Sequence, residues 1–101
     1  MNTSLASRSE LLVMGMLRDH PRGMFGLEMV RASVGLFKRG SIYVLLGRME
    51  DKGYVRQMID KQAKHPGLPR PLYTLTALGQ RTLTATEATF AAALGWKLVR
   101  T

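Results

Sequence analysis

The spacing of apolar residues is helical at both ends of the chain and strand-like in between. Apolar positions follow a 3.6-residue period over residues 4–18, 27–35 and 41–53, and a further helical segment begins at residue 76. Residues 54–60 and 71–76 instead follow a period of two, which is typical of strands. The sequence therefore predicts three helices, a hairpin whose ten-residue loop spans residues 61–70, and a C-terminal helix.

The third predicted helix has the clearest pattern. Four apolar residues recur at i, i+3, i+4 and i+7: Ile42, Leu45, Leu46 and Met49. Gly53 follows at the place of a C-terminal cap. The opposite face carries Ser41, Val44 and Arg48, with Tyr43 to one side, and is a candidate for contacts outside the fold.

The two terminal helices give further expectations. In the first, Ser9 with Glu10 suits the beginning of a helix. Its predicted buried face consists of Leu12, Val13, Met16 and Leu17. The C-terminal helix carries a narrow apolar stripe that predicts a helix-packing seam between two chains, formed by Leu83, Phe90, Leu94 and Leu98. Trp96, the single tryptophan, is expected to cover this seam.

The net charge of +8 over 101 residues is concentrated in the middle of the chain. Residues 37–70 contain eight basic and three acidic residues, so they carry five of the eight net charges. Charge alone is compatible with binding to polyphosphates or to anionic membranes. The order of the predicted elements decides between them.

Three helices followed by a β-hairpin are the arrangement of a winged helix, whose third helix can enter the major groove while the hairpin follows the phosphates. The predicted fold class is therefore mainly α with a small β-hairpin. A winged helix-turn-helix of three helices and a two-stranded wing occupies residues 1–75, and a C-terminal dimerisation helix occupies residues 76–101, together forming one compact domain.

The basic and polar residues of these elements are the candidate DNA contacts. On the third helix and the connector before it they are Lys38, Arg39, Ser41, Tyr43 and Arg48, and in the wing they are Lys61, Lys64, His65 and Arg70. Arg48 could bond a guanine or a phosphate, and Tyr43 could reach a phosphate or pack beneath the wing. The alternatives are a solvated helix face and a loop that only favours solubility. The spacing of Pro66 and Pro69 could also suit an SH3-like domain.

Several classes of function are excluded by residue content. The chain has no cysteine and two distant histidines, His20 and His65, so no metal or cofactor site is expected. No nucleophile elbow, phosphate loop or paired-carboxylate pattern indicates an enzyme. No apolar run approaches the roughly 18 to 20 residues that cross a bilayer, so we expect a cytoplasmic protein without membrane contact.

Three segments resemble the successive signatures of the PadR-type winged-helix transcriptional regulators. They are LLVMGMLRDHPRGMFGLEMV, RGSIYVLLGRMEDKGYV and GLPRPLYTLTALGQ, which together span about residues 10 to 82. The sharpest part runs from Gly40 to Gly53 and is similar to the family's small-residue, Leu-Tyr, Leu-Leu, Arg-Leu-Glu and Gly pattern. The sequence departs from the family pattern at four positions, Leu27, Val44, Gly47 and Leu68.

The resemblance implies a dimeric repressor that binds double-stranded DNA at a palindromic operator, with the C-terminal helix forming the homodimer. It also implies that Ser41, Tyr43 and Arg48 face DNA and that Arg70 acts in the wing. Some relatives stack flat aromatic ligands between interface tryptophans, which makes Trp96 a candidate for contact with a small aromatic effector. The alternative hypothesis is a protein-interaction module whose basic face docks an acidic partner, such as transcription machinery. Val44 and Gly47 motivate it because they reduce the polar content of the third helix.

Overall fold

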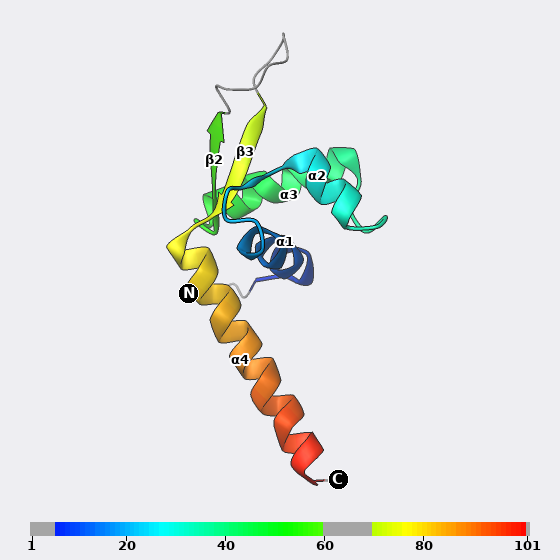
Figure 1. Cartoon of the computed structure of the whole chain (residues 1–101), viewed down its shortest axis with the longest axis vertical. Coiled ribbons are helices and arrows are strands. Elements are labelled where there is room, and N and C mark those ends of the chain that lie inside the picture. Colours follow the sequence, from blue (N-terminus) through cyan, green and yellow to red (C-terminus); the bar gives the residue numbers. More distant parts are fainter. Residues whose placement is uncertain (1–5, 60–69, 101) are drawn as a thin grey trace.

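The computed structural model describes residues 6–59 and 70–100, with side chains described up to residue 94. Helices α1, α2 and α3 lie beside a small sheet, and the last helix projects from the body in the direction opposite to the hairpin (Figure 1). In chain order the elements are α1 (Arg8–Arg18), β1 (Met24–Phe25), α2 (Gly26–Ala32), α3 (Arg39–Asp51), β2 (Val55–Ile59), β3 (Pro71–Leu75) and α4 (Ala77–Arg100). The predicted winged-helix fold is confirmed.

The N-cap of α1 is two residues before Ser9, where the sequence suggested that the helix begins, and the helix itself begins at Arg8. Ser7 is the N-cap: its hydroxyl accepts from the Glu10 N–H at 3.2 Å, and its own N–H donates to the Glu10 carboxylate at 2.8 Å. The buried face is therefore set by Glu10, and it continues through Val13, Met14 and Leu17. The prediction that Leu12 is buried was wrong, because this rotation of α1 leaves its side chain 45% exposed.

An ion pair joins the first turn of α1 to the C-terminal end of α3. The Lys52 ammonium, at the C-cap of α3, lies 2.9 and 3.1 Å from the two carboxylate oxygens of Glu10, and Glu10 is only 1% exposed. A cation at a helix C-terminus also interacts favourably with the helix dipole. The pair therefore fixes α1 against the end of α3 and satisfies a buried charge.

We expect this ion pair to make the free energy of unfolding decrease as the pH becomes acidic. Burial raises the pKa of Glu10, but the hydrogen bonds from Lys52 and from the Ser7 N–H outweigh it, so the net pKa lies below the ordinary 4.5. A lowered carboxyl pKa stabilises the fold above the unfolded-state pKa, and this stabilisation is lost as the pH falls through the folded-state pKa. Glu10→Gln should lower the free energy of unfolding at pH 7 by about 1 to 2 kcal/mol.

Urea unfolding of both proteins at pH 7 and pH 3 checks this prediction. The difference between Glu10→Gln and the unchanged chain should be smaller at pH 3 than at pH 7, because the Glu10 charge is lost as the pH falls toward and through its lowered folded-state pKa. A difference that is equal at both pH values would mean that the charge of Glu10 contributes nothing.

The connection between α2 and α3 is held by one buried hydroxyl. Ser33 Oγ donates to the Val30 carbonyl at 2.7 Å and accepts from the Phe37 N–H at 3.0 Å. Val34 and Gly35, next in the chain, have positive φ angles of 51° and 92° and reverse the chain direction. This turn sets α2 and α3 as a helix-turn-helix pair.

The sheet contains one strand more than the predicted hairpin. Its order is β1-β3-β2, all antiparallel, with five residue pairs between β2 and β3 from Val55↔Leu75 to Ile59↔Pro71. We call this β2–β3 hairpin the wing. The added strand β1 pairs Met24 with Tyr73 and Phe25 with Leu72, and so connects the wing to the start of α2.

Helix α4 begins immediately after β3. Thr76 Oγ accepts from the Gly79 N–H at 3.0 Å and donates to the Gly53 carbonyl, so Thr76 caps the helix at the residue where the sequence predicted its beginning. Leu83 is 4% exposed and belongs to the core of the single chain. Its assignment to the seam between two chains is therefore corrected: Leu83 packs within the protomer, whereas Phe90 and Leu94 are more than half exposed.

The core gathers residues from every element: Val13, Met14, Leu17, Met24, Met29, Phe37, Ile42, Leu46, Met49, Tyr54, Val55, Tyr73 and Leu83. Three of its members confirm the predicted buried face of α3, namely Ile42, Leu46 and Met49. No helix within residues 6–59 and 70–100 is both long and apolar enough to cross a membrane.

Candidate nucleic-acid interface

Helix α3 presents a continuous exposed face opposite its core-facing residues. Ser41, Val44 and Arg48 are all exposed on this side, and with residues of the α2–α3 turn and of the α1 N-terminus they line a groove. The groove residues are Ser7, Ser9, Leu36, Phe37, Ser41, Val44, Leu45 and Arg48. We call the side of α3 opposite Ile42, Leu46 and Met49 its outer face.

Charge is distributed unevenly along α3. Lys38 at the N-cap and Arg39 at the first helical position are exposed, and the first turn contains no acidic residue. Glu50 and Asp51 lie at the other end. The positive end of the helix dipole adds to the two basic side chains, so the N-terminal half of α3 is the part that attracts phosphates.

Tyr43 lies between α3 and the beginning of α2. It is 43% exposed, and a Cβ added to Gly26 would lie 2.7 to 2.9 Å from atoms of its ring and hydroxyl. The ring therefore rests against the first residue of α2, and a side chain at Gly26 would displace it. The sequence left two alternatives for Tyr43, contact with a phosphate or packing beneath the wing. In the structure one edge of the ring packs against α2 and not beneath the wing.

Arg70 stands one residue before β3, at the end of the wing where Pro71 pairs with Ile59 and which lies away from α4. Its guanidinium carbon lies 4.2 Å from the centroid of the Phe25 ring in β1, a distance typical of cation–π stacking. Phe25 immediately precedes Gly26, so Arg70 and Tyr43 are brought to the same short segment. Lys61, Lys64 and His65 lie outside the described residues.

The other end of α3 is tied to the wing. The Gln57 side-chain amide in β2 donates to the Glu50 carboxylate at 3.2 Å. Burial raises the pKa of the Tyr73 hydroxyl in β3, and the nearby charge of Glu50 raises it further. Tyr73 therefore stays neutral, and the acidic end of α3 faces the sheet and not the groove.

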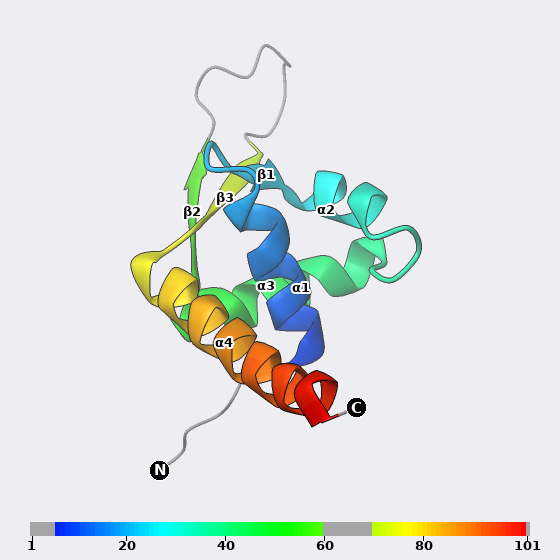
Figure 2. The same ribbon diagram turned by 60° about the horizontal axis from the view of Figure 1, so that its bottom comes forward.

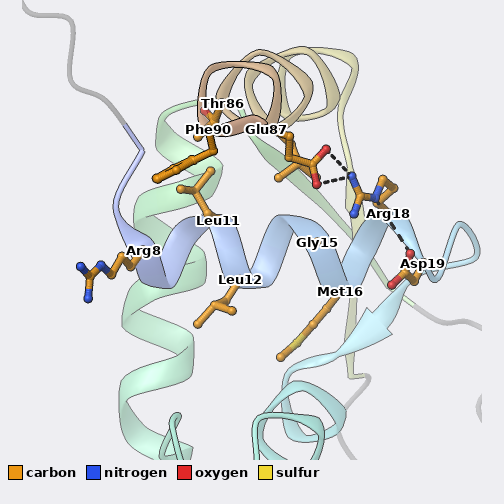
Figure 3. Close-up of a pocket in the computed structure, with 11 residues that line it drawn as sticks. Arg8, Leu11, Leu12, Gly15, Met16, Arg18, Asp19, Thr86, Glu87 and Phe90 are labelled. Atoms are coloured by element: carbon orange, nitrogen blue, oxygen red, sulfur yellow. Dashed lines mark hydrogen bonds and ion pairs between the residues drawn. The ribbon is translucent and has the colours of Figure 1, made fainter. Parts of the chain in front are cut away.

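A second exposed surface lies where α4 crosses α1 (Figure 2). An apolar groove between these helices, here called the α1/α4 groove, is lined by Arg8, Leu11, Leu12, Gly15, Met16, Arg18, Asp19, Leu83, Thr86, Glu87 and Phe90. Figure 3 shows Phe90 and Leu11 pointing toward one another across it. At its other end the Arg18 guanidinium binds both Glu87 oxygens, at 2.6 and 2.7 Å.

Two residues of the predicted seam are uncovered on α4. Phe90 is 62% exposed and Leu94 is 59% exposed. The side chains of Trp96 and Leu98 lie outside the described part of the structure. Two large, exposed apolar side chains on one face of a helix indicate a surface suited to a partner.

Sequence reasoning missed the residues that support the interface. Phe25 and Gly26 lie between the first two predicted helices, where the sequence predicted no contact, yet they position Arg70 and Tyr43. The available signal was a glycine directly after an aromatic residue, which permits close packing of a second ring. Among residues 6–59 and 70–100, no three His, Asp or Glu side chains converge in a way that could hold a metal ion.

Comparisons with known proteins agree with this geometry. The model of the transcriptional regulator PadR-like family matches residues 13–85, which include α3 and the wing. No curated protein sequence matches the chain.

Solved structures share the fold. A PadR-like transcription factor from Bacteroides fragilis has 20% sequence identity and a TM-score of 0.73, with 92% of this chain and 89% of that chain covered. A transcriptional regulator from Thermoplasma acidophilum has 26% identity and a TM-score of 0.65, covering 91% and 90%.

A variant of MepR from Staphylococcus aureus bound to an oligodeoxyribonucleotide has 20% identity and a TM-score of 0.76. It is aligned over 94% of this chain, which spans 64% of the MepR chain. Proteins of the matched family are regulators of transcription and not enzymes. Because the family model covers most of its length, from α1 through the wing into α4, the chain belongs to the PadR-like family of transcriptional regulators.

Proposed function

We propose that the protein is a homodimeric repressor that binds a palindromic DNA operator through α3 and the wing. The observation that carries this proposal is the outer face of α3, which is exposed and lies next to the basic N-terminus of the same helix. Family membership supports DNA binding over the alternative of a module that docks an acidic protein. A bound dimer would repress by covering DNA that the transcription machinery must reach.

The proposed contacts divide into two kinds. Arg48 and Ser41 lie on the outer face, where they would meet base edges in the major groove. Lys38, Arg39 and Arg70 would bind phosphates on either side, with Arg70 held in place by the Phe25 ring. The wing residues Lys61, Lys64 and His65 would extend the phosphate contacts further along the backbone.

The proposed dimer uses the apolar surface of α4. Phe90 and Leu94 would pack against the same surface of a second copy, beside the α1/α4 groove. A two-fold axis at this interface makes the same patch serve both chains, and it presents the two α3 helices to an inverted repeat. An aromatic effector, if one regulates the protein, would bind at this interface near Trp96.

Selection of binding sites from a randomised DNA pool tests the function. We expect an enriched inverted repeat whose half-sites are centred about 10 base pairs apart, because two recognition helices on one face of DNA are separated by one helical turn. Binding should weaken steeply with salt, with a log-log slope of about 0.9 for each phosphate contact. A pool that returns no enriched sequence would contradict sequence-specific regulation.

A further inference from the structure

Val44 is an apolar residue whose side chain is exposed to solvent in the middle of α3. It is 64% exposed, whereas Ile42 and Leu46, two residues away on either side, are fully buried. At 100° per residue this places Val44 close to the centre of the outer face. The side chain therefore points directly away from the core.

The surroundings of Val44 leave room for a close approach. Gly40 and Gly47 lie one turn away on the same face, and a Cβ added to either would meet nothing within 4 Å. Glycine and valine both have lower helix propensity than alanine. At Gly47 no neighbour among the described residues requires the absence of a side chain. A helix without side chains at these positions can bring its backbone, and with it the short Val44 side chain, near a ligand surface.

The chemistry of the major groove identifies what an apolar side chain can read there. Each base pair displays hydrogen-bond donors and acceptors in this groove, and thymine alone adds an apolar group, its 5-methyl. Lys38 and Arg39 lie at the start of α3, and the first turn of the helix has no acidic residue. Arg48 lies one turn after Val44, so Val44 lies between basic residues in the region that would approach DNA. A stiff β-branched side chain also loses little rotamer freedom on contact.

We propose that Val44 contacts the 5-methyl group of a thymine and thereby selects a T·A pair at one position of each half-site. This inference rests on the proposed function and adds a base identity to it. Arg48 lies four residues further along, about 6 Å on the helix axis, which corresponds to roughly two base steps of 3.4 Å. The thymine should therefore lie within about two base pairs of the base pair that Arg48 contacts.

Removal of the methyl group from DNA tests the contact directly. Each thymine of the selected operator is replaced in turn by deoxyuridine, which keeps every hydrogen bond and removes only the methyl. At one position the replacement should weaken binding about four-fold, the effect of withdrawing one methyl-sized group from an apolar contact. Replacement in both half-sites should weaken binding about sixteen-fold.

The Val44→Ala variant shows whether Val44 senses that methyl. The variant should bind the thymine and deoxyuridine operators with nearly equal affinity, because its side chain no longer reaches the group. Alanine is the better helix former, so the variant should fold, as a thermal melt will verify. Val34→Ala is the matched control: Val34 is 90% exposed in the α2–α3 turn, and its loss should leave the full deoxyuridine effect.

Three results would overturn the inference while leaving the proposed function intact. They are an operator without thymine in its half-sites, an operator whose thymines can all be replaced without loss, and a Val44→Ala variant as sensitive as the unchanged chain. In the last two cases Val44 faces something other than a base, such as a protein partner. If the chain selects no DNA sequence at all, the proposed function and the inference fail together.

Discussion

Phe90→Glu is expected to raise the dissociation constant of the dimer about a thousand-fold. An aromatic residue at the centre of an interface typically contributes about 2 kcal/mol or more. A two-fold interface contains it twice, so the loss is about 4 kcal/mol, or close to three powers of ten. Phe90 is 62% exposed within the single chain, so the fold itself should keep its stability to within about 0.5 kcal/mol.

Sedimentation equilibrium over a range of protein concentrations measures this change, and Ala92→Glu is the matched control. Ala92 is exposed two residues further along α4, about 200° around the helix from Phe90. The Ala92→Glu substitution introduces the same charge on the other side of α4 and should leave the dimer nearly intact. Equal effects of the two variants, or a monomeric unchanged chain at micromolar concentration, would contradict the proposed interface.

Arg48→Ala is expected to weaken binding to the selected operator by at least thirty-fold. A side chain that pairs with a base edge contributes about 1 to 3 kcal/mol, and the dimer makes the contact in both half-sites. Together they amount to about 2 to 6 kcal/mol. The preference for one base pair in each half-site should also relax, because the residue that reads it is absent.

Arg70→Ala provides the comparison for Arg48→Ala. Its guanidinium lies on the Phe25 ring at the end of the wing away from α4, where it would meet phosphate. It should lower affinity for all sequences alike and reduce the salt slope by about 1 for each protomer. Titrations of operator and unrelated DNA at several salt concentrations separate the two variants. If Arg48→Ala also weakened both DNAs equally, Arg48 would bind phosphate and not a base.

The elements most accessible from sequence are those that depend on local periodicity. Ile42, Leu46 and Met49 are spaced on one helical face, and the structure buries all three. The wing strands were predicted equally well, because Val55 to Ile59 and Pro71 to Leu75 follow the period of a strand. These elements need no distant partner to be recognised.

The features that sequence reasoning missed depend on contacts between distant residues. Glu10 belongs to the buried face of α1 only because Lys52, 42 positions away, neutralises it. The two-residue strand β1 is too short for any periodicity and exists through its pairing with β3. The contact of Tyr43 with Gly26 is equally non-local.

The C-terminal helix shows a different kind of ambiguity. Leu83, Phe90 and Leu94 share one face of α4, and their spacing is the same whether a face packs inside a chain or between chains. The structure divides the stripe, with Leu83 at 4% exposure and Phe90 at 62%. The division arises because Leu83 reaches the core, whereas Phe90 faces Leu11 across the open α1/α4 groove, and periodicity does not contain this geometry (Figure 3).

A single residue joins the wing to the helix proposed to form the dimer. β3 ends at Leu75 and α4 begins at Ala77, and the Thr76 hydroxyl between them is bonded on both sides. A dimer built in this way has no flexible linker between the wing and the dimer helix. One extra base pair between the half-sites turns one half-site by about 34° and moves it by about 3.4 Å, which such a dimer could not follow. Among relatives, operator spacing should therefore evolve with the contact between α4 helices, and operator sequence should evolve separately with the outer face of α3.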